Sequence, residues 1–129
     1  MRFMVSLIFD EAQMDEVTRE QMEETASEMN QYNDELRKAG VMLAGEGLAP
    51  SDMARTLRWG EAGKPVATDG PFAESKEQLG GFWILECADL DEAVEWAGKA
   101  PIRNGALEVR PIVESAEEAR ELHQRQASS

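Results

Sequence analysis

The stretch Arg2-Phe3-Met4-Val5-Ser6-Leu7-Ile8-Phe9 decides the fold, because it has the length of a strand and is apolar on both faces. Phe3 and every second residue after it share one face, and Met4 and its alternates share the other. Residues 81–87, Gly-Phe-Trp-Ile-Leu-Glu-Cys, are a second strand of the same kind. A sheet that contains both strands must therefore be covered on both sides.

A long amphipathic helix is predicted at residues 18–39. Thr18 and Gln21 form a capping box, in which the threonine hydroxyl accepts a backbone amide and the glutamine side chain reaches back. Gly40 supplies a left-handed stop after Lys38 in the last turn. The apolar residues recur at three- and four-residue steps and form one stripe. This stripe consists of Met22, Ala26, Met29, Tyr32, Leu36 and Ala39.

The remaining elements complete an α+β pattern. We expect further strands at 41–48, 54–59, 64–68, 81–87 and 106–113, a helix between Asp89 and Pro101, and a polar terminal helix at 114–126. Residues 10–17 are expected to form an acidic connector, and residues 69–78 a polar loop. The order predicts a ferredoxin-like antiparallel sheet with two helices on one face. Because the helices cover only that face, we expect a homodimer in which the same sheet of a second copy covers the other.

Composition limits the classes of partner. The 129 residues include 26 acidic and 13 basic side chains, a net charge of −13, which argues against direct binding to nucleic acid or anionic membranes. Solubility alone also accounts for this charge. The N-terminal apolar run is too short for a signal peptide, and no stretch reaches the ~20 apolar residues of a membrane helix. The single cysteine, Cys87, excludes an intramolecular disulfide, so we expect a cytoplasmic protein.

A family resemblance rests on three motifs. Residues 69–82, Asp-Gly-Pro-Phe-Ala-Glu-Ser-Lys-Glu-Gln-Leu-Gly-Gly-Phe, resemble the signature of the DGPF proteins in the YCII-related family. Gly45-Glu46-Gly47-Leu48 before it and Glu108-Val109-Arg110-Pro111 after it match the family pattern in the expected order. The resemblance covers residues 1–113 as one domain and leaves 114–129 as a C-terminal helical extension.

The resemblance implies that ferredoxin-like domains pair through their sheets into a dimeric α/β barrel. The function of the family is largely unknown, but members are encoded beside, or fused to, extracytoplasmic-function sigma factors, which implies a regulatory setting. Wider relatives have a histidine near the end of the first strand that works with an aspartate as an acid/base pair. Here the only histidine is His123, in the terminal helix, so the sequence departs from that pattern.

Two carboxylates are candidate catalytic residues. Asp69 opens the polar loop, and Glu46 lies between two glycines that indicate a bulge. A carboxylate whose pKa is raised by partial burial can act as a base near neutrality. The alternative for Asp69 is a turn residue that binds its own loop amides, and the alternative for Glu46 is a solvated side chain.

Three other residues are candidates for substrate binding. Phe72 would line a pocket, while Lys76 and Arg110 would bind an anionic group. The alternatives are a core position for Phe72 and a structural ion pair for Lys76 and for Arg110, the latter with Glu108.

Two functions from different classes follow. The first is a small-molecule pocket protein with acid/base catalysis of the isomerase or lyase type, centred on Asp69. The second is a non-catalytic ligand-binding or accessory module linked to transcriptional regulation. We expect no cofactor, since the sequence has no phosphate-binding loop, dinucleotide fingerprint or serine elbow, and no metal, since His123 stands alone.

Overall fold

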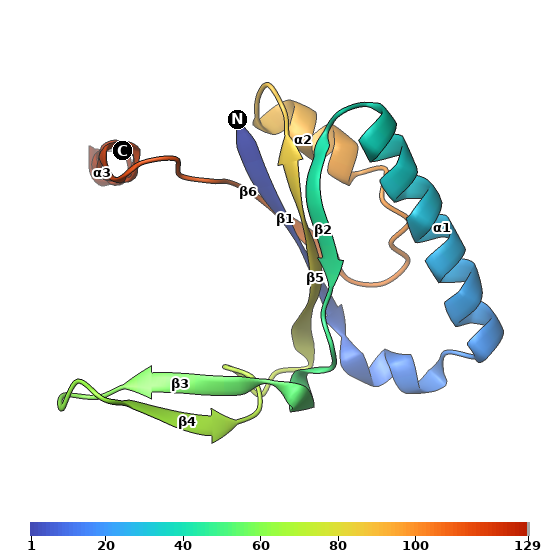
Figure 1. Cartoon of the computed structure of the whole chain (residues 1–129), viewed down its shortest axis with the longest axis horizontal. Coiled ribbons are helices and arrows are strands. Elements are labelled where there is room, and N and C mark those ends of the chain that lie inside the picture. The colour runs from blue at the N-terminus through green and yellow to red at the C-terminus, as the bar shows by residue number, and fades with distance from the viewer. Residues whose placement is uncertain (129) are drawn as a thin grey trace.

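A computed structural model of residues 1–128 shows an α+β fold built on a four-stranded antiparallel sheet (Figure 1). The strand order is β2-β5-β1-β6, which two interleaved β-α-β units produce, as expected from the sequence. The strands are β1 (Arg2–Asp10), β2 (Met42–Gly47), β5 (Glu77–Glu86) and β6 (Ala106–Pro111). The two-faced strands β1 and β5 are neighbours in the centre of the sheet.

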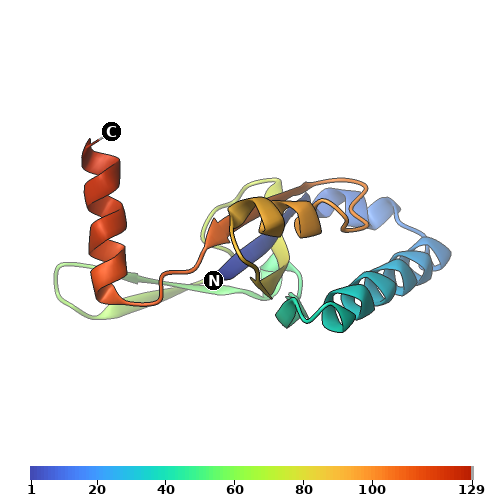
Figure 2. The ribbon, with the colours of Figure 1, turned by 90° about the horizontal axis from the view of Figure 1, so that it is seen from above.

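Two helices lie on one face of this sheet, and three further elements stand outside the layer (Figures 1 and 2). The covering helices are α1 (Arg19–Lys38) and α2 (Leu90–Ala97). The hairpin of β3 (Arg55–Trp59) and β4 (Pro65–Asp69) and the terminal helix α3 (Ala116–Ser128) project from the other face.

The segments expected to be irregular are more ordered than predicted. Residues 10–17 contain a 3-10 helix, η1 (Glu11–Glu16), because the Asp10 carboxylate caps it by accepting the Ala12 amide at 2.9 Å. A second short 3-10 helix, η2 (Ser51–Met53), precedes the hairpin. The loop expected at 69–78 is shorter, since β4 continues to Asp69 and β5 already begins at Glu77.

The core lies between the inner face of the sheet and the two helices. It consists of Phe3, Val5, Tyr32, Leu36, Val41, Trp83, Leu85, Cys87, Ala93 and Ala97. The Tyr32 hydroxyl donates a hydrogen bond to the Trp96 carbonyl at 2.8 Å and so joins α1 to α2. Burial raises the pKa of Tyr32 to about 12, and burial also raises the pKa of the Cys87 thiol.

Only the C-terminal half of α1 packs into this core. Tyr32 and Leu36 are its buried residues, whereas Met22 is half exposed. Of the predicted apolar stripe, only the second half is therefore buried in the core. Along its first half, α1 leaves a space above the sheet.

Within residues 1–128, no helix covers the outer face of the sheet (Figure 1). Cross-strand pairing aligns Ile84 of β5 with Met4 of β1, and Phe82 with Ser6. Met4, Phe82 and Ile84 form an apolar centre around Ser6. The same cross-strand rows continue into the edge strands of the sheet. There they contain Glu46 on β2 and the pair Glu108 and Arg110 on β6.

Candidate functional site

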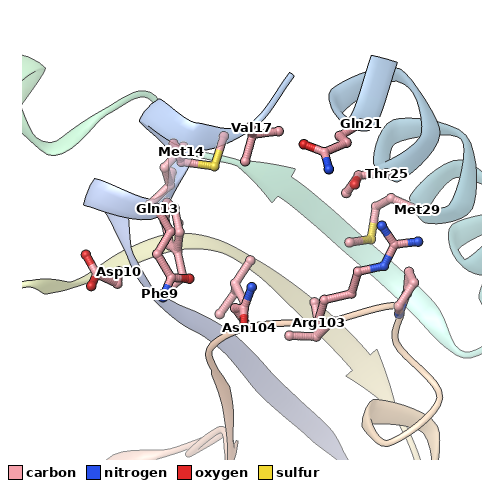
Figure 3. A pocket seen from close by; sticks show the side chains of 15 residues that line it. Phe9, Asp10, Gln13, Met14, Val17, Gln21, Thr25, Met29, Arg103 and Asn104 are labelled. Carbon is pink, nitrogen blue, oxygen red and sulfur yellow. The ribbon is translucent and has the colours of Figure 1, made fainter. Parts of the chain in front are cut away.

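The space beneath the N-terminal half of α1 is a cleft of about 450 Å³, called here the helix-side cleft (Figure 3). It lies between the last residues of β1, η1, the first turns of α1 and the segment 101–104 that leads into β6. Figure 3 shows side chains from all these elements converging on it. The cleft exists because α1 contacts the core only through its second half.

The walls of the helix-side cleft are mainly apolar, with a few hydrogen-bonding groups among them. The apolar side chains are those of Leu7, Phe9, Met14, Val17, Met29, Leu48, Pro101 and Ile102. The neutral polar side chains are Gln13, Gln21, Thr25 and Asn104. Amides and hydroxyls within an apolar wall bind and orient a small molecule by hydrogen bonds to its polar atoms.

Both ionisable side chains of this wall are already engaged. Arg103 pairs with Glu28 at 2.6 Å and with Glu24 at 3.6 Å, so it ties the 101–104 segment to α1. Asp10 caps η1. Among the described residues, the cleft therefore offers neither a free cation for an anionic ligand nor an unused carboxylate for proton transfer.

A second cleft of about 500 Å³ adjoins the first and shares Phe9 and Leu48 with it. Glu11 of η1 closes its far side, because the Glu11 carboxylate accepts hydrogen bonds from the Ser51 hydroxyl and from the Ser51 amide, the latter at 2.8 Å. These bonds, the hydroxyl first, lower the pKa of Glu11. The contact, called here the Glu11–Ser51 clasp, fixes η2 against η1.

A smaller slot of about 170 Å³ lies at the β2 edge of the sheet and shares Leu7, Met29 and Gly80 with the helix-side cleft. Glu46 borders this slot between its two flanking glycines, but its side chain lies on the outer face of the sheet, in the row of Phe82. No hydrogen bond or ion pair reaches the Glu46 carboxylate from residues 1–128. The sheet therefore separates the Glu46 carboxylate from the clefts on the helix side.

The structure places Asp69 elsewhere. Its side chain is 88% exposed at the end of β4 and pairs with Arg55 across the hairpin at 3.0 Å. Asp69 lines neither the helix-side cleft nor its two neighbours. Within one chain Asp69 and Glu46 are not brought together around a common cavity, and their catalytic roles stay predictions.

The predicted binding residues are also dispersed. Phe72 is 76% exposed rather than in the core, lies under the Arg58 guanidinium at 4.8 Å, and lines a groove at the root of the hairpin. Arg110 is on the outer face of the sheet and pairs with Glu108 at 2.6 Å, the structural alternative weighed for it. Lys76 is exposed in the loop before β5.

Gly80 shapes the floor of the helix-side cleft. It is the extra residue of β5 where the register with β1 shifts between Leu7 and Ile8. A Cβ atom on Gly80 would lie 2.3 Å from Cε1 of Phe9. The Phe9 ring can therefore lie across the strand only because residue 80 has no side chain.

Comparison with known proteins agrees with this architecture. A model of the YCII-related domain matches residues 1–116. The chain belongs to the YCII-related domain family. It is 37% identical over 106 residues to an uncharacterized protein of Rhizobium meliloti (strain 1021), a match that covers 80% of this chain and 85% of the relative.

Sequence reasoning missed most residues of the helix-side cleft in this YCII-related domain. Thr25 lies between Met22 and Met29 of the α1 stripe, and this polar break was a signal in the sequence. Among residues 1–128 no group of three metal-ligating side chains gathers. Within the same residues, no helix is both long and apolar enough to cross a bilayer.

Proposed function

We propose that this YCII-related domain binds a small, uncharged and largely apolar molecule in the helix-side cleft, as a ligand-binding module without acid/base chemistry of its own. The observation that carries this proposal is the combination of an apolar wall with hydrogen-bonding amides and no free ionisable group. The cleft volume of about 450 Å³ is within the range of small-molecule sites.

The charge of the protein also favours an uncharged ligand. The net charge of −13 repels anions, and two carboxylates already neutralise Arg103 at the mouth of the cleft. An amide of modest size would place its carbonyl and N–H groups against Gln13 and Asn104 and its hydrocarbon against Phe9 and Met29.

The alternative, an acid/base enzyme centred on Asp69, has less support from the geometry, because that carboxylate is solvated and ion-paired. The accessory role in transcriptional control that the family resemblance implies fits a binding module better. In that role, the binding of a ligand in the helix-side cleft would be the signal that the module passes to the transcriptional machinery.

The test uses N-phenyl-1-naphthylamine, a neutral aromatic probe whose fluorescence rises in an apolar site. We expect saturable binding to the wild-type protein, and displacement by neutral amides in preference to carboxylates. Thr25→Phe fills the cleft from α1 and should abolish binding.

Ser27→Phe is the matched control, because residue 27 is two positions further along the same helix and points away from the cleft. It should bind the probe as wild type does. Equal binding by the two variants would place the probe elsewhere and overturn the proposal.

We also infer that the protein pairs through the outer face of its sheet. Met4, Ile8, Phe82 and Ile84 form a half-buried apolar centre there that no helix covers. Monomeric proteins rarely leave contiguous apolar surfaces of this kind in water. The same face of a second copy is self-complementary to it under two-fold symmetry.

A further inference from the structure

The β3–β4 hairpin is an arm with an unpartnered apolar face. Pairing aligns Leu57 with Ala67 and Trp59 with Pro65, so these four side chains share one face of the hairpin. Leu57 is 50% exposed and Trp59 is 67% exposed. Figures 1 and 2 show the arm extending well clear of the sheet on its outer side.

An isolated two-stranded hairpin is only marginally stable in water and needs a third strand or a helix against its apolar face. Nothing in residues 1–128 supplies one. The hairpin leaves the lower end of the sheet in Figure 1, whereas α3, the helix on the same side, leaves the upper end.

The helix α3 also stands away from the sheet, and its root is fixed. The Arg2 guanidinium donates two hydrogen bonds of 2.9 Å to the Glu114 carboxylate, and the Ile112 amide donates to the Arg2 carbonyl. Ser115 then caps the helix by accepting the Glu118 amide at 3.1 Å. A helix anchored in this way, standing away from its own sheet, is poised to contact another chain.

The charges of the two arms are complementary. The hairpin carries Arg55, Arg58 and Lys64 against Glu61 and Asp69, a net charge of +1 in a chain whose total is −13. The helix α3 carries Glu117, Glu118 and Glu121 against Arg120 and Arg125, a net charge of −1. The hairpin is thus the cationic arm, and it would repel a second hairpin but attract α3.

We propose that in the dimer the hairpin of each copy packs its Leu57 and Trp59 face against α3 of the other. We consider a two-fold axis that lies between the two sheets and runs perpendicular to their strands. This axis reverses the strand direction, so the sheet end that carries the hairpin in one copy meets the sheet end that carries α3 in its partner. It therefore sets each hairpin beside a partner α3. An axis parallel to the strands would instead set hairpin against hairpin.

The reach of the arm agrees with this arrangement. Five-residue strands extend about 17 Å, and stacked sheets lie about 10 Å apart, so a hairpin leaving one sheet passes beyond the partner sheet. The inference rests on outer-face pairing and adds to it two arm contacts, which fix the relative orientation of the two copies.

A charge-swap experiment tests the contact. One variant carries Arg55→Glu and Lys64→Glu, which makes the hairpin acidic. Arg55 shares the face of Leu57 and Trp59, and the contact of Arg58 with Phe72 stays intact. The other carries Glu117→Lys and Glu121→Lys, which makes α3 basic and leaves the capping residue Glu118 intact. Sedimentation equilibrium should show dimerisation at least tenfold weaker for each variant alone than for wild type.

An equimolar mixture of the two should recover wild-type dimerisation, and native mass spectrometry should show the mixed dimer, because both arm contacts then join opposite charges. Recovery should disappear at 1 M salt, where charge interactions are screened. A misfolded hairpin could not be rescued by mixing, so recovery reports the contact itself.

Three results would overturn the proposal. The mixture could dimerise no better than its components, the hairpin variant could dimerise as wild type does, or the α3 variant could be unaffected, as hairpin-to-hairpin pairing requires. A wild-type protein that stays monomeric would instead refute the outer-face pairing on which the arms depend.

Discussion

Gly80 and Phe9 illustrate how one missing side chain shapes the helix-side cleft. The ring of Phe9 lies where a Cβ of residue 80 would be, at 2.3 Å and 2.6 Å from two ring carbons. The Phe9 ring of β1 therefore lies over β5 at Gly80, and both residues line the helix-side cleft.

Gly80→Ala should force that ring out of place. We expect a loss of about 1–3 kcal/mol in the free energy of unfolding, as for other overpacked sites, together with weaker binding of the naphthylamine probe. Gly47→Ala is the control, since a Cβ there meets nothing within 4 Å. Urea unfolding of both variants checks the expectation, and identical midpoints would contradict it.

The Glu11–Ser51 clasp gives a residue-level prediction of pH dependence. Ser51 donates to the charged form of Glu11 and so lowers its pKa below the usual 4.5. The clasp therefore contributes stability that is fully present above pH 4.5 and is lost as the pH falls through the folded-state pKa.

Ser51→Ala should bring the pKa of Glu11 back toward 4.5, because the hydroxyl is the largest cause of the shift. Carboxyl carbon chemical shifts followed by NMR between pH 2 and pH 7 measure it directly. A Glu11 pKa that does not move in Ser51→Ala would show that the hydroxyl plays no part.

At the scale of the element, the two halves of α1 have different structural roles. Its second half is buried through Tyr32 and Leu36, while its first half forms one side of the cleft. The first half is held in place from outside, because Arg103 bridges to Glu24 and Glu28.

Arg103→Gln should release the first half of α1 without unfolding the second. We expect faster amide hydrogen exchange in residues 20–28 and unchanged exchange in residues 32–38, as measured by mass spectrometry. Arg37→Gln is the matched control, since Arg37 pairs only with Asp34 within the same helix. Equal exchange in the two variants would show that the bridge does not hold the helix.

At the scale of the whole molecule, the uncovered sheet face is the dominant feature. Ile84 lies at its centre, between Ala44 of β2 and Met4 of β1. A charge there would be buried without a partner in a face-to-face dimer.

Ile84→Arg should therefore yield a folded monomer. Light scattering should give the 14.3 kDa chain mass for the variant and twice that mass for the wild type, with similar circular dichroism. Val94→Arg is the control on the half-exposed side of α2 and should leave the dimer intact. A wild-type mass of 14.3 kDa at every concentration would refute the pairing.

The sequence by itself determined the elements and their order, because local rules dictate them. The alternation at residues 2–9 placed Phe3 and Val5 on one face, which lies in the core, and Thr18 with Gln21 formed the predicted capping box. Two interleaved β-α-β units then left few possible strand orders.

Only the tertiary structure decided where a ligand has room. The cleft depends on how far α1 tilts from the sheet, on a one-residue register shift at Gly80 and on Arg103 reaching Glu28 from 75 residues away. Asp69 began the clearest motif, yet it ends an exposed arm, because a motif records local turn chemistry and not which surfaces the chain brings together. Such long-range placements arise from the packing of whole elements, which no local pattern encodes.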